Sequence, residues 1–437
     1  MKTRLQKLLN DNVIKVADII AFIIVLLSAV VIYFSVISET FGTEEVILTA
    51  ALVLISLIVS KLDFKSLIDF LPSVIICIAV LIVLLVSGKY NETGFNAPVG
   101  HALKFVDIAF VQAIAVTFRR FDKTKKSIIL NTALLTVLVS LIISIYYVKA
   151  QDIYAIRYFQ DRGFDKVFDF NQMYSIPIII TIIVYFILSS KKEYLKFALI
   201  YIPLLIAGIY CVYISLYTTA LLLMIAGIAL DIAVWIFMLL YKKSKKALLI
   251  VLCVCVLLVL LCVIFSQQLS DLIYKMTENM NWIVRDRIRS VADTVFRTDH
   301  DLDYSYERRE ELAGYSIETF KKHPLIGIGY AGYEYGVIGC HQEWQDMLGV
   351  FGIIGVVLFV AMMLFYCYIA LKKAETLTDR ISFSIALVIF IVLGFLNPCL
   401  STPVLFALFV IAPNISALNP FGFINNTRTK RKAQSES

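Results

Sequence analysis

The sequence predicts an all-α polytopic integral membrane protein. Of its 437 residues, 60% are hydrophobic and 17% are charged, whereas soluble domains carry about 25% charged residues. The apolar residues also gather into segments long enough to cross a bilayer, for which a helix needs about 20 residues. The excess apolar surface must face lipid, so we expect a single membrane domain over residues 1–437.

We expect about twelve transmembrane helices from the number of apolar segments of membrane length. The first segment is too long for a signal-peptide core and is not followed by a small-residue cleavage site, so it should be retained as a helix. The approximate ranges of the expected spans are 14–37, 45–60, 71–87, 102–118, 127–148, 175–190, 196–214, 217–240, 247–265, 347–370, 381–397 and 404–418.

Basic residues gather on one side of these expected spans. By the positive-inside bias that side is cytoplasmic, so we expect both termini in the cytoplasm, with a disordered C-terminal tail over 425–437. This topology accounts for the net charge of +7, which therefore gives no reason to expect a nucleic-acid partner. The clusters are Lys2, Arg4, Lys7 and Lys15; Arg119, Arg120, Lys123, Lys125 and Lys126; Lys191 and Lys192; Lys242, Lys243, Lys245 and Lys246; Lys372 and Lys373; Arg428, Lys430, Arg431 and Lys432.

Two connections on the outer side are long, namely 149–174 and, between the ninth and tenth spans, 266–346. Long connections in compact proteins usually carry function. In the larger loop, apolar residues recur at helical spacing over 303–322, and Pro324 should end that helix. Residues 270–284 have the composition of a helix lying in the headgroup region. We therefore expect a partly helical lid over the outer face.

The arginines of the larger loop are candidate ligands for an anion. The loop holds nine Lys and Arg against fourteen Asp and Glu, so it is net acidic and its basic residues must act at particular positions. Arg285, Arg287 and Arg289 alternate, and Arg308 and Arg309 are adjacent, so several guanidinium groups could reach one phosphate. The alternative is that these arginines pair with neighbouring Asp and Glu residues of the loop.

His341 lies just before the tenth expected span, at the depth of an anionic lipid headgroup. An imidazole there could donate a hydrogen bond to a phosphate or accept a proton. Glu343 and Asp346 follow within a few residues and are the alternative bases. We therefore expect the chemistry of the protein near this end of the loop.

The segment 327–332 reads Gly-Ile-Gly-Tyr-Ala-Gly and matches the glycine spacing of a dinucleotide-binding loop. That loop requires a preceding strand and a following helix, whereas this segment follows a proline that ends a helix. We therefore reject a nucleotide site and expect the glycines to form a tight turn leading toward His341.

Three charged residues lie inside expected spans. Asp231 is in the eighth, and Lys104 and Asp107 are one helical turn apart in the fourth. Intramembrane charges are candidates for function, but Lys104 and Asp107 could neutralise each other, and Asp231 could pair with a neighbouring helix. Proton coupling is the functional alternative.

The larger loop and the following segment resemble the signature region of the O-antigen ligase and polysaccharide polymerase (Wzy) superfamily. The similarity covers about 308–359. It rests on Arg309, the run from His323 to Gly329 (HPLIGIG), His341 with Gln342, Gly349, and the run from Gly352 to Gly355 (GIIG). A weaker similarity lies at 168–174, where FDFNQMY looks like the family's asparagine-containing segment that opens a membrane helix.

The sequence departs from the family pattern in two places. Gln342 stands where the family usually has asparagine. Many members also carry a serine-arginine pair opening a mid-chain helix, whereas the aligned residues 217–220 read Tyr-Thr-Thr-Ala. If that arginine contacts the lipid diphosphate in relatives, another residue must replace it here, and Arg157 and Arg162 of the smaller outer loop are the candidates.

The resemblance implies a GT-C-like glycosyltransferase of the bacterial plasma membrane that acts on the outer face without a metal or other cofactor. It would polymerise polyprenyl-diphosphate-linked repeat units into a capsular or other cell-surface polysaccharide. Arginines would stabilise the charge that develops on the diphosphate leaving group. The candidate catalytic residues are His341 and Arg309, and the candidate substrate-binding residues are Arg308, Arg285, Arg289, Arg162, Arg157, Gln342 and Glu343.

The expected partners are the lipid-linked donor and acceptor, the bilayer, and flippase and chain-length regulator proteins. An O-antigen-type ligase, which moves finished glycan to another acceptor, is the alternative within the same chemistry. A lipid-linked oligosaccharide flippase or transporter is the alternative from another class. Transporters often show internal symmetry, and no internal repeat relates the two halves of this chain.

Overall fold

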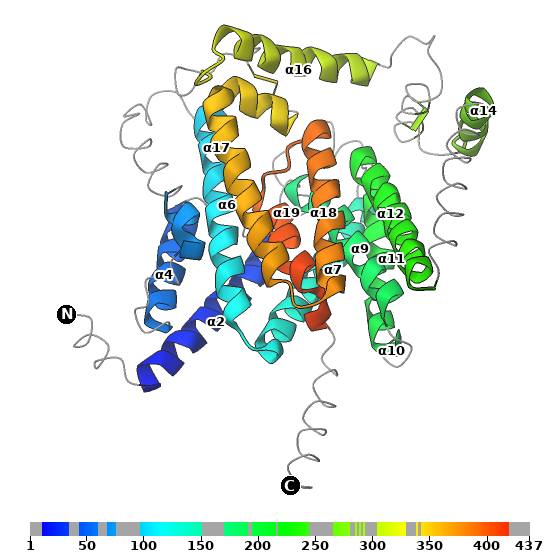
Figure 1. Ribbon diagram of the computed structural model, residues 1–437. Coiled ribbons are helices and arrows are strands. Elements are labelled where there is room, and N and C mark those ends of the chain that lie inside the picture. The colour runs from blue at the N-terminus through cyan, green and yellow to red at the C-terminus, as the bar shows by residue number, and fades with distance from the viewer. Residues whose placement is uncertain are drawn as a thin grey trace.

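The computed structural model is a helical bundle with one helix, α16, lying across its upper end (Figure 1). It describes residues 11–34, 43–59, 68–75, 97–150, 170–190, 195–215, 217–243, 265–279, 285, 288–289, 292, 304–328, 338–339 and 342–418. These residues form helices, turns and bends, and no strand occurs among them. The predicted all-α polytopic fold class is confirmed.

The observed helices coincide with the predicted apolar segments. Ten of the twelve expected spans overlap one of the helical elements, whereas 71–87 and 247–265 lie mostly outside the described residues. The elements are α2 (Asp11–Tyr33), α4 (Thr43–Val59), α6 (Ala97–Arg120), α7 (Lys123–Ala150), α9 (Phe170–Ser189), α10 (Leu195–Ala198), η2 (Leu199–Tyr201), α11 (Ile202–Ile214), α12 (Thr218–Lys243), α14 (Ser266–Met276), α16 (Tyr304–Lys322), α17 (Glu343–Lys373), α18 (Leu377–Leu396), α19 (Thr402–Phe406), η3 (Ala407–Ile411) and η4 (Ala412–Leu418).

Six helices among the described residues are long and apolar enough to cross a membrane. Three apolar helical segments, Ile47–Ser56, Leu199–Ile214 and Thr402–Leu418, are shorter. The six spans are Val13–Tyr33, Lys123–Tyr146, Gln172–Ser189, Thr218–Tyr241, Glu343–Lys373 and Leu377–Leu396.

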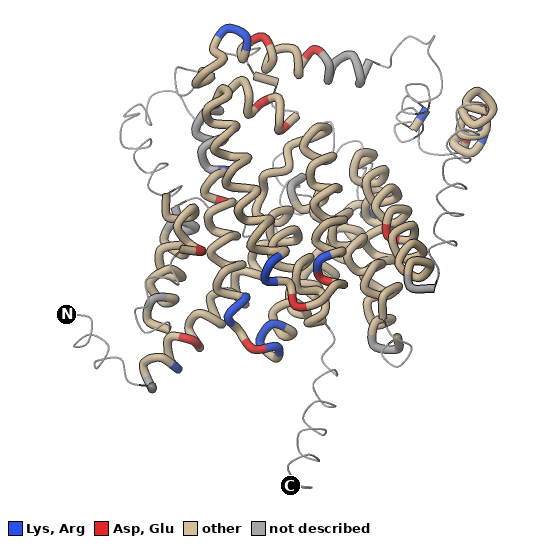
Figure 2. The backbone as a smooth tube through the Cα atoms, in the orientation of Figure 1, with Lys and Arg blue, Asp and Glu red and all other residues tan. Residues whose placement is uncertain are grey.

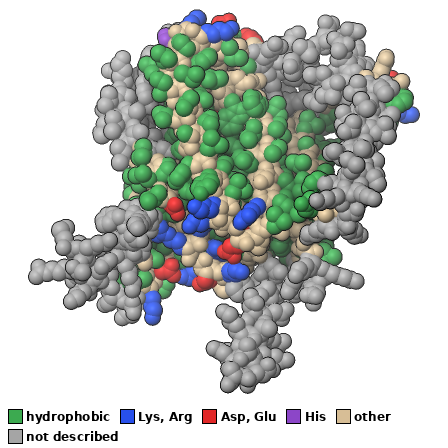
Figure 3. All heavy atoms as spheres, in the orientation of Figure 1, with side chains coloured by type: hydrophobic (Ala, Val, Ile, Leu, Met, Phe, Trp, Pro, Cys, Tyr) green, Lys and Arg blue, Asp and Glu red, His purple; other side chains and the backbone are tan. Residues whose placement is uncertain are grey.

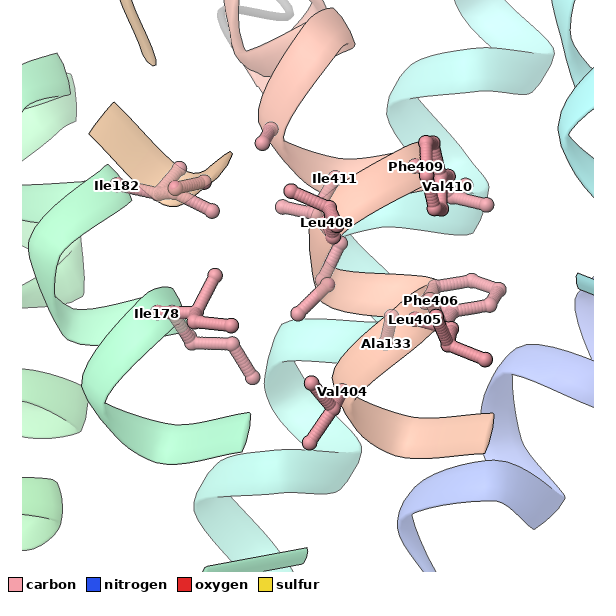
Figure 4. Packing of buried hydrophobic residues seen from close by; sticks show 14 of the residues in the cluster. Ala133, Ile178, Ile182, Val404, Leu405, Phe406, Leu408, Phe409, Val410 and Ile411 are labelled. Atoms are coloured by element: carbon pink, nitrogen blue, oxygen red, sulfur yellow. The ribbon is translucent and has the colours of Figure 1, made fainter. Parts of the chain in front are cut away.

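The C-terminal helical segment, from α19 to η4, forms the centre of the bundle. Every residue from Val404 to Ala412 is fully buried, so this segment, which is apolar on all sides, is surrounded by other helices of the bundle. Figure 4 shows Ile178 and Ile182 of α9 facing this segment. Accordingly α9 is the most buried of the six spans, with 78% of its apolar window inside the protein, compared with 22% for α12.

Basic residues gather at the end of the bundle opposite α16 (Figures 2 and 3). Two predicted clusters meet there. Lys126 at the start of α7 donates a hydrogen bond of 2.8 Å to Glu375, which follows the α17 lysines Lys372 and Lys373. Lys125 is ion-paired to Asp18 of α2. The clusters around residues 119–126 and 372–373 therefore lie at one end, as the expected topology requires.

Candidate functional site

The lid helix predicted over 303–322 is observed as α16, which spans Tyr304–Lys322. Its last turn closes with a hydrogen bond of 2.9 Å from the His323 amide to the Thr319 carbonyl. Pro324 cannot continue the helix because it lacks an amide hydrogen. The chain then turns, and the Gly327 amide bonds back to the His323 carbonyl at 3.0 Å with a φ of +65° at Gly327.

This turn docks on α17 through the main chain. α17 is broken at Gly352, which has a φ of 60° and a ψ of −170°. The break frees amide and carbonyl groups of α17 that would otherwise bond within the helix. They bond to the turn instead: Ile328 N to Gly349 O at 3.1 Å, Ile353 N to Pro324 O at 2.9 Å, and Ile354 N to Leu325 O at 3.1 Å.

Two glycines make this close approach of main chains feasible. A Cβ atom on Gly352 would lie 2.5 Å from the Gly327 nitrogen, and one on Gly327 would lie 2.3 Å from the Val350 carbonyl oxygen. Both residues also have positive φ, which glycine adopts most readily. The glycine-rich run therefore follows a helix and begins with a turn at Gly327, in agreement with the prediction. Residues 329–332 lie outside the described residues, so the expected course of the chain toward His341 stays a prediction.

The carboxylate of Asp346 fastens the chain on both sides of His341. The Ser316 hydroxyl of α16 donates to Asp346 Oδ1 at 2.6 Å, and the Gln342 amide donates to Oδ2 at 3.2 Å. The Ser316 oxygen in turn accepts from the Gly339 amide at 2.9 Å. Ser316 and Asp346 are both buried. We call these four residues, Gly339, Ser316, Gln342 and Asp346, the Asp346 clamp.

A buried ion pair joins the first turn of α17 to α6. Lys104 Nζ donates to Glu343 Oε1 at 2.8 Å. The other carboxylate oxygen accepts from the amides of Cys399 at 2.9 Å and Leu400 at 3.2 Å. The Glu343 side chain is fully buried, whereas that of Lys104 keeps 25% of its exposure. In the structure Glu343 is therefore an anchor, and the substrate-binding role expected from the sequence stays a prediction.

The connection between α18 and α19 carries polar groups with unused hydrogen-bonding capacity. Asn397 Nδ2 and Ser401 Oγ are buried and have no hydrogen-bond partner among the described residues, and the same holds for Gln345 Oε1 in the first turn of α17. This connection includes Cys399 and Leu400, which bond to Glu343. Buried polar atoms without partners are rare in native structures, which marks this end of the bundle as a candidate binding region.

Buried polar atoms without hydrogen-bond partners also occur near residues 217–220, where the sequence lacks the arginine of the family pattern. Tyr174 of α9 and Tyr217 before α12 are in edge-to-face contact, with ring centroids 6.1 Å apart, so the two helix N-termini lie side by side. Gln172 Nε2 and Thr218 Oγ1, at these termini, are buried and have no hydrogen-bond partner among the described residues. Helix N-termini favour anions.

The predicted arginines are not all gathered at the Asp346 clamp. Arg289 donates to Tyr274 O at 2.8 Å and to Thr277 Oγ1 at 3.0 Å, and its guanidinium lies 4.6 Å from the Tyr274 ring centroid. It therefore holds the end of α14, which lies apart from the first turn of α17 in Figure 1. Arg285 is half-buried. Of the headgroup helix expected over 270–284, the structure shows a helix only up to Met276, within α14 (Ser266–Met276), followed by a turn over 277–279, while 280–284 lie outside the described residues. Its location in the headgroup region stays a prediction.

Several predicted site residues lie beyond what the structure describes. These are His341, Arg157 and Arg162, together with the side chains of Arg308 and Arg309, whose backbone belongs to α16. Among the intramembrane charges, Lys104 pairs with Glu343. Asp231 is fully buried, and neither carboxylate oxygen has a hydrogen-bond partner among the described residues.

Sequence reasoning missed Ser316 and the Asn397–Ser401 connection. A serine in an amphipathic helix carries no distinguishing pattern, and its role depends on a carboxylate 30 positions away. The lysine in an apolar span was a usable signal for Lys104, but its partner lies 239 positions along the chain.

Comparison with known proteins gives one finding. A family model described as O-antigen ligase matches residues 203–360, which extend from α11 through α16 and the Asp346 clamp to the middle of α17. The search of curated proteins found no match.

Proposed function

We propose that this protein is a member of the O-antigen ligase and Wzy superfamily that polymerises polyprenyl-diphosphate-linked oligosaccharide repeat units. The proposal is supported by the family model described as O-antigen ligase, which matches residues 203–360. The glycan on one polyprenyl diphosphate would be transferred to a hydroxyl of a second lipid-linked unit. The proposed site is the outer face of a bacterial plasma membrane, with both termini in the cytoplasm. The collection of basic clusters at the end opposite α16 supports this orientation.

The observation that carries the proposal is the Asp346 clamp around His341. Hydrogen bonds from Gly339 and Gln342 converge on Ser316 and Asp346, so the chain entering and leaving residues 340–341 is held against α16 and α17. A rigid support of this kind is what a reacting side chain needs, because a misplacement of about 1 Å can cost on the order of 100-fold in rate.

The proposed glycosyl transfer needs two catalytic side chains, those of His341 and Arg309. His341 takes the proton of the acceptor hydroxyl as that oxygen attacks the anomeric carbon. Arg309 stabilises the charge that develops on the diphosphate as the sugar–oxygen bond breaks. We propose that neither step uses a metal. Arg308, Arg285, Gln342 and the two arginines of the 149–174 loop remain proposed contacts for the substrate.

The test is elongation by the purified protein in proteoliposomes that contain only lipid-linked repeat units. We expect a ladder of lengthened glycans without nucleotide, added metal or ion gradient. His341→Ala and Arg309→Ala should each abolish the ladder. The matched controls are His300→Ala in the same loop and Arg380→Ala, an exposed arginine of α18, which should leave it intact. Full elongation by both site variants would refute this assignment.

We propose that Asp346 positions the chain around His341 and takes no part in the chemical step. The Asp346→Asn variant distinguishes this positioning role from a purely structural one. Asp346→Asn keeps the size of the side chain but removes one of the two acceptor oxygens that hold Ser316 and Gln342. We expect kcat to fall on the order of 100-fold while KM changes little and stability falls by only about 1 kcal/mol from the lost acceptor. A proportional loss of folded protein instead would indicate a purely structural role.

An O-antigen-type ligase is the second candidate, because the matching family model is described as O-antigen ligase. Supplying finished lipid-linked glycan together with a different acceptor distinguishes the two functions. Transfer to that acceptor without elongation of repeat units would favour the ligase, and movement of lipid-linked glycan across vesicles without any transfer would favour a flippase.

A further inference from the structure

The turn after α16 exposes two large apolar side chains although its main chain is firmly docked. Leu325 is 64% exposed and Ile326 is 70% exposed. Their backbone neighbours Pro324 and Gly327 are tied to α17 by hydrogen bonds and by the close glycine contact. These side chains are therefore held outward by a fixed turn, which requires an apolar environment outside the protein.

The exposed turn continues the lipid-facing surface of α17. The amides of Ile353 and Ile354 bond to the carbonyls of Pro324 and Leu325, and both isoleucines are about half exposed, like the residues one turn further along the span. Figure 3 shows this apolar surface running along α17 up to the end where α16 lies. Because α17 is long and apolar enough to span a membrane, this surface lies against lipid.

Basic residues border the apolar tip. Lys321 and Lys322 form the last turn of α16, His323 follows, and all three are exposed. Glu318, one turn earlier, is the exposed acidic residue of the same helix end, so the edge keeps a net positive charge. An apolar tip followed by lysines matches the order of acyl chains and phosphate headgroups along the membrane normal.

We propose that Lys321, Lys322, His323, Leu325 and Ile326, the α16 turn surface, bind anionic phospholipid headgroups of the bilayer. Leu325 and Ile326 insert at the boundary of the acyl chains, and the two lysines contact lipid phosphates. Lipid binding at this surface holds the C-terminal end of α16 at the membrane and thereby fixes the helix that carries Ser316. The ligand is a bilayer lipid, distinct from the glycan substrate of the proposed reaction.

The test places a photocrosslinking residue, p-benzoylphenylalanine, at position 326 of the full chain in nanodiscs of phosphatidylcholine with a minor fraction of phosphatidylglycerol. The control position is Gly314 of α16, where an added side chain would meet open space. Illumination should give lipid adducts at position 326 and few at position 314, as measured by mass spectrometry. Equal adducts at both positions, or none at 326, would overturn the insertion of the turn.

The charge contribution is tested in the same nanodiscs. Each lysine near an anionic surface should strengthen headgroup association roughly fivefold, so the adducts at position 326 should be enriched in phosphatidylglycerol over its bulk fraction. Lys321→Gln with Lys322→Gln should reduce that enrichment to the bulk ratio. The control pair at the other end of α17, Lys372→Gln with Lys373→Gln, should leave it unchanged. Adducts that follow the bulk composition in the unaltered protein, or that form only when lipid-linked glycan is added, would refute the proposal.

Discussion

The ion pair between Glu343 and Lys104 offers the sharpest test of how the candidate site is held together. It joins the first turn of α17 to α6, and the same carboxylate accepts the amides of Cys399 and Leu400. Three elements that are distant in sequence therefore meet at one side chain. We predict that Glu343→Gln and Lys104→Met each destabilise the protein and that the two losses are less than additive when the changes are combined.

The expected magnitude follows from burial and from the number of bonds. Removing one partner of a buried ion pair costs about 3–5 kcal/mol, and the lower end applies because Lys104 keeps 25% of its exposure. Glutamine also has one acceptor oxygen where Glu343 has two, so it cannot serve both Lys104 and the backbone amides, and an orphaned donor adds about 1 kcal/mol or more. We therefore expect Glu343→Gln to cost about 4 kcal/mol.

The double-mutant cycle isolates the pair. Lys104→Met alone should cost about 3 kcal/mol because it leaves the Glu343 charge buried. The double variant should cost less than the sum of the two single changes, with a coupling free energy of about 2 kcal/mol. The assay is reversible denaturant unfolding of the purified protein in detergent micelles, followed by circular dichroism.

The control uses an exposed ion pair at the other end of the bundle. The Lys123 side chain is 59% exposed and lies 3.6 Å from Glu375, so Lys123→Met should cost less than about 1 kcal/mol. A coupling free energy between Lys104 and Glu343 below about 0.5 kcal/mol would refute the prediction, because the two charges would then contribute independently.

Three further predictions concern single positions. Gly352→Ala should destabilise the protein by at least about 2 kcal/mol through its positive φ and its main-chain contact, whereas Gly314→Ala in α16 should stabilise it by up to about 1 kcal/mol; equal thermal unfolding temperatures would contradict the docked turn. Asp231→Asn should keep or raise the unfolding temperature near neutral pH, because it replaces a buried ionisable group, whose oxygens have no hydrogen-bond partner among the described residues, with a side chain that cannot ionise, and a large decrease would reveal a required carboxylate. The hydrogen bond from Lys126 holds the pKa of Glu375 below its ordinary value of 4.5, so this carboxylate contributes stability above that pH and loses it as the pH falls through the lowered pKa; Glu375→Gln should flatten the acid side of the stability profile, and an unchanged profile would argue against the pairing.

Much of the fold could be predicted from the length and composition of the apolar segments. Segment length and composition located ten helical segments that the structure describes, and Pro324 correctly marked the end of α16. These features are local, because a helix satisfies its own backbone hydrogen bonds and a proline ends it wherever it occurs. The break of α17 at Gly352 was not predicted, since its cause is the turn that packs against it.

The location of the candidate site stays a prediction, and its contacts could not be predicted. The signature from Arg309 to Gly355 directed attention to this region, which lies within the residues that the family model matches. The sequence also led us to treat Arg289 as a substrate ligand, whereas in the structure it bonds to the end of α14. A guanidinium can satisfy its donors with a carboxylate, a phosphate or carbonyl oxygens equally well, so residue type alone does not select the partner.

The sequence by itself determined that this is a helical membrane protein and that its residues 203–360 resemble the O-antigen ligase family, because hydrophobicity, helix length and a short motif are all encoded in neighbouring residues. Only the tertiary structure decided that Glu343 pairs with Lys104 and that Ser316 and Asp346 hold the chain around His341. Such contacts depend on which helices become neighbours. That choice follows from packing over the whole bundle, which no local pattern contains.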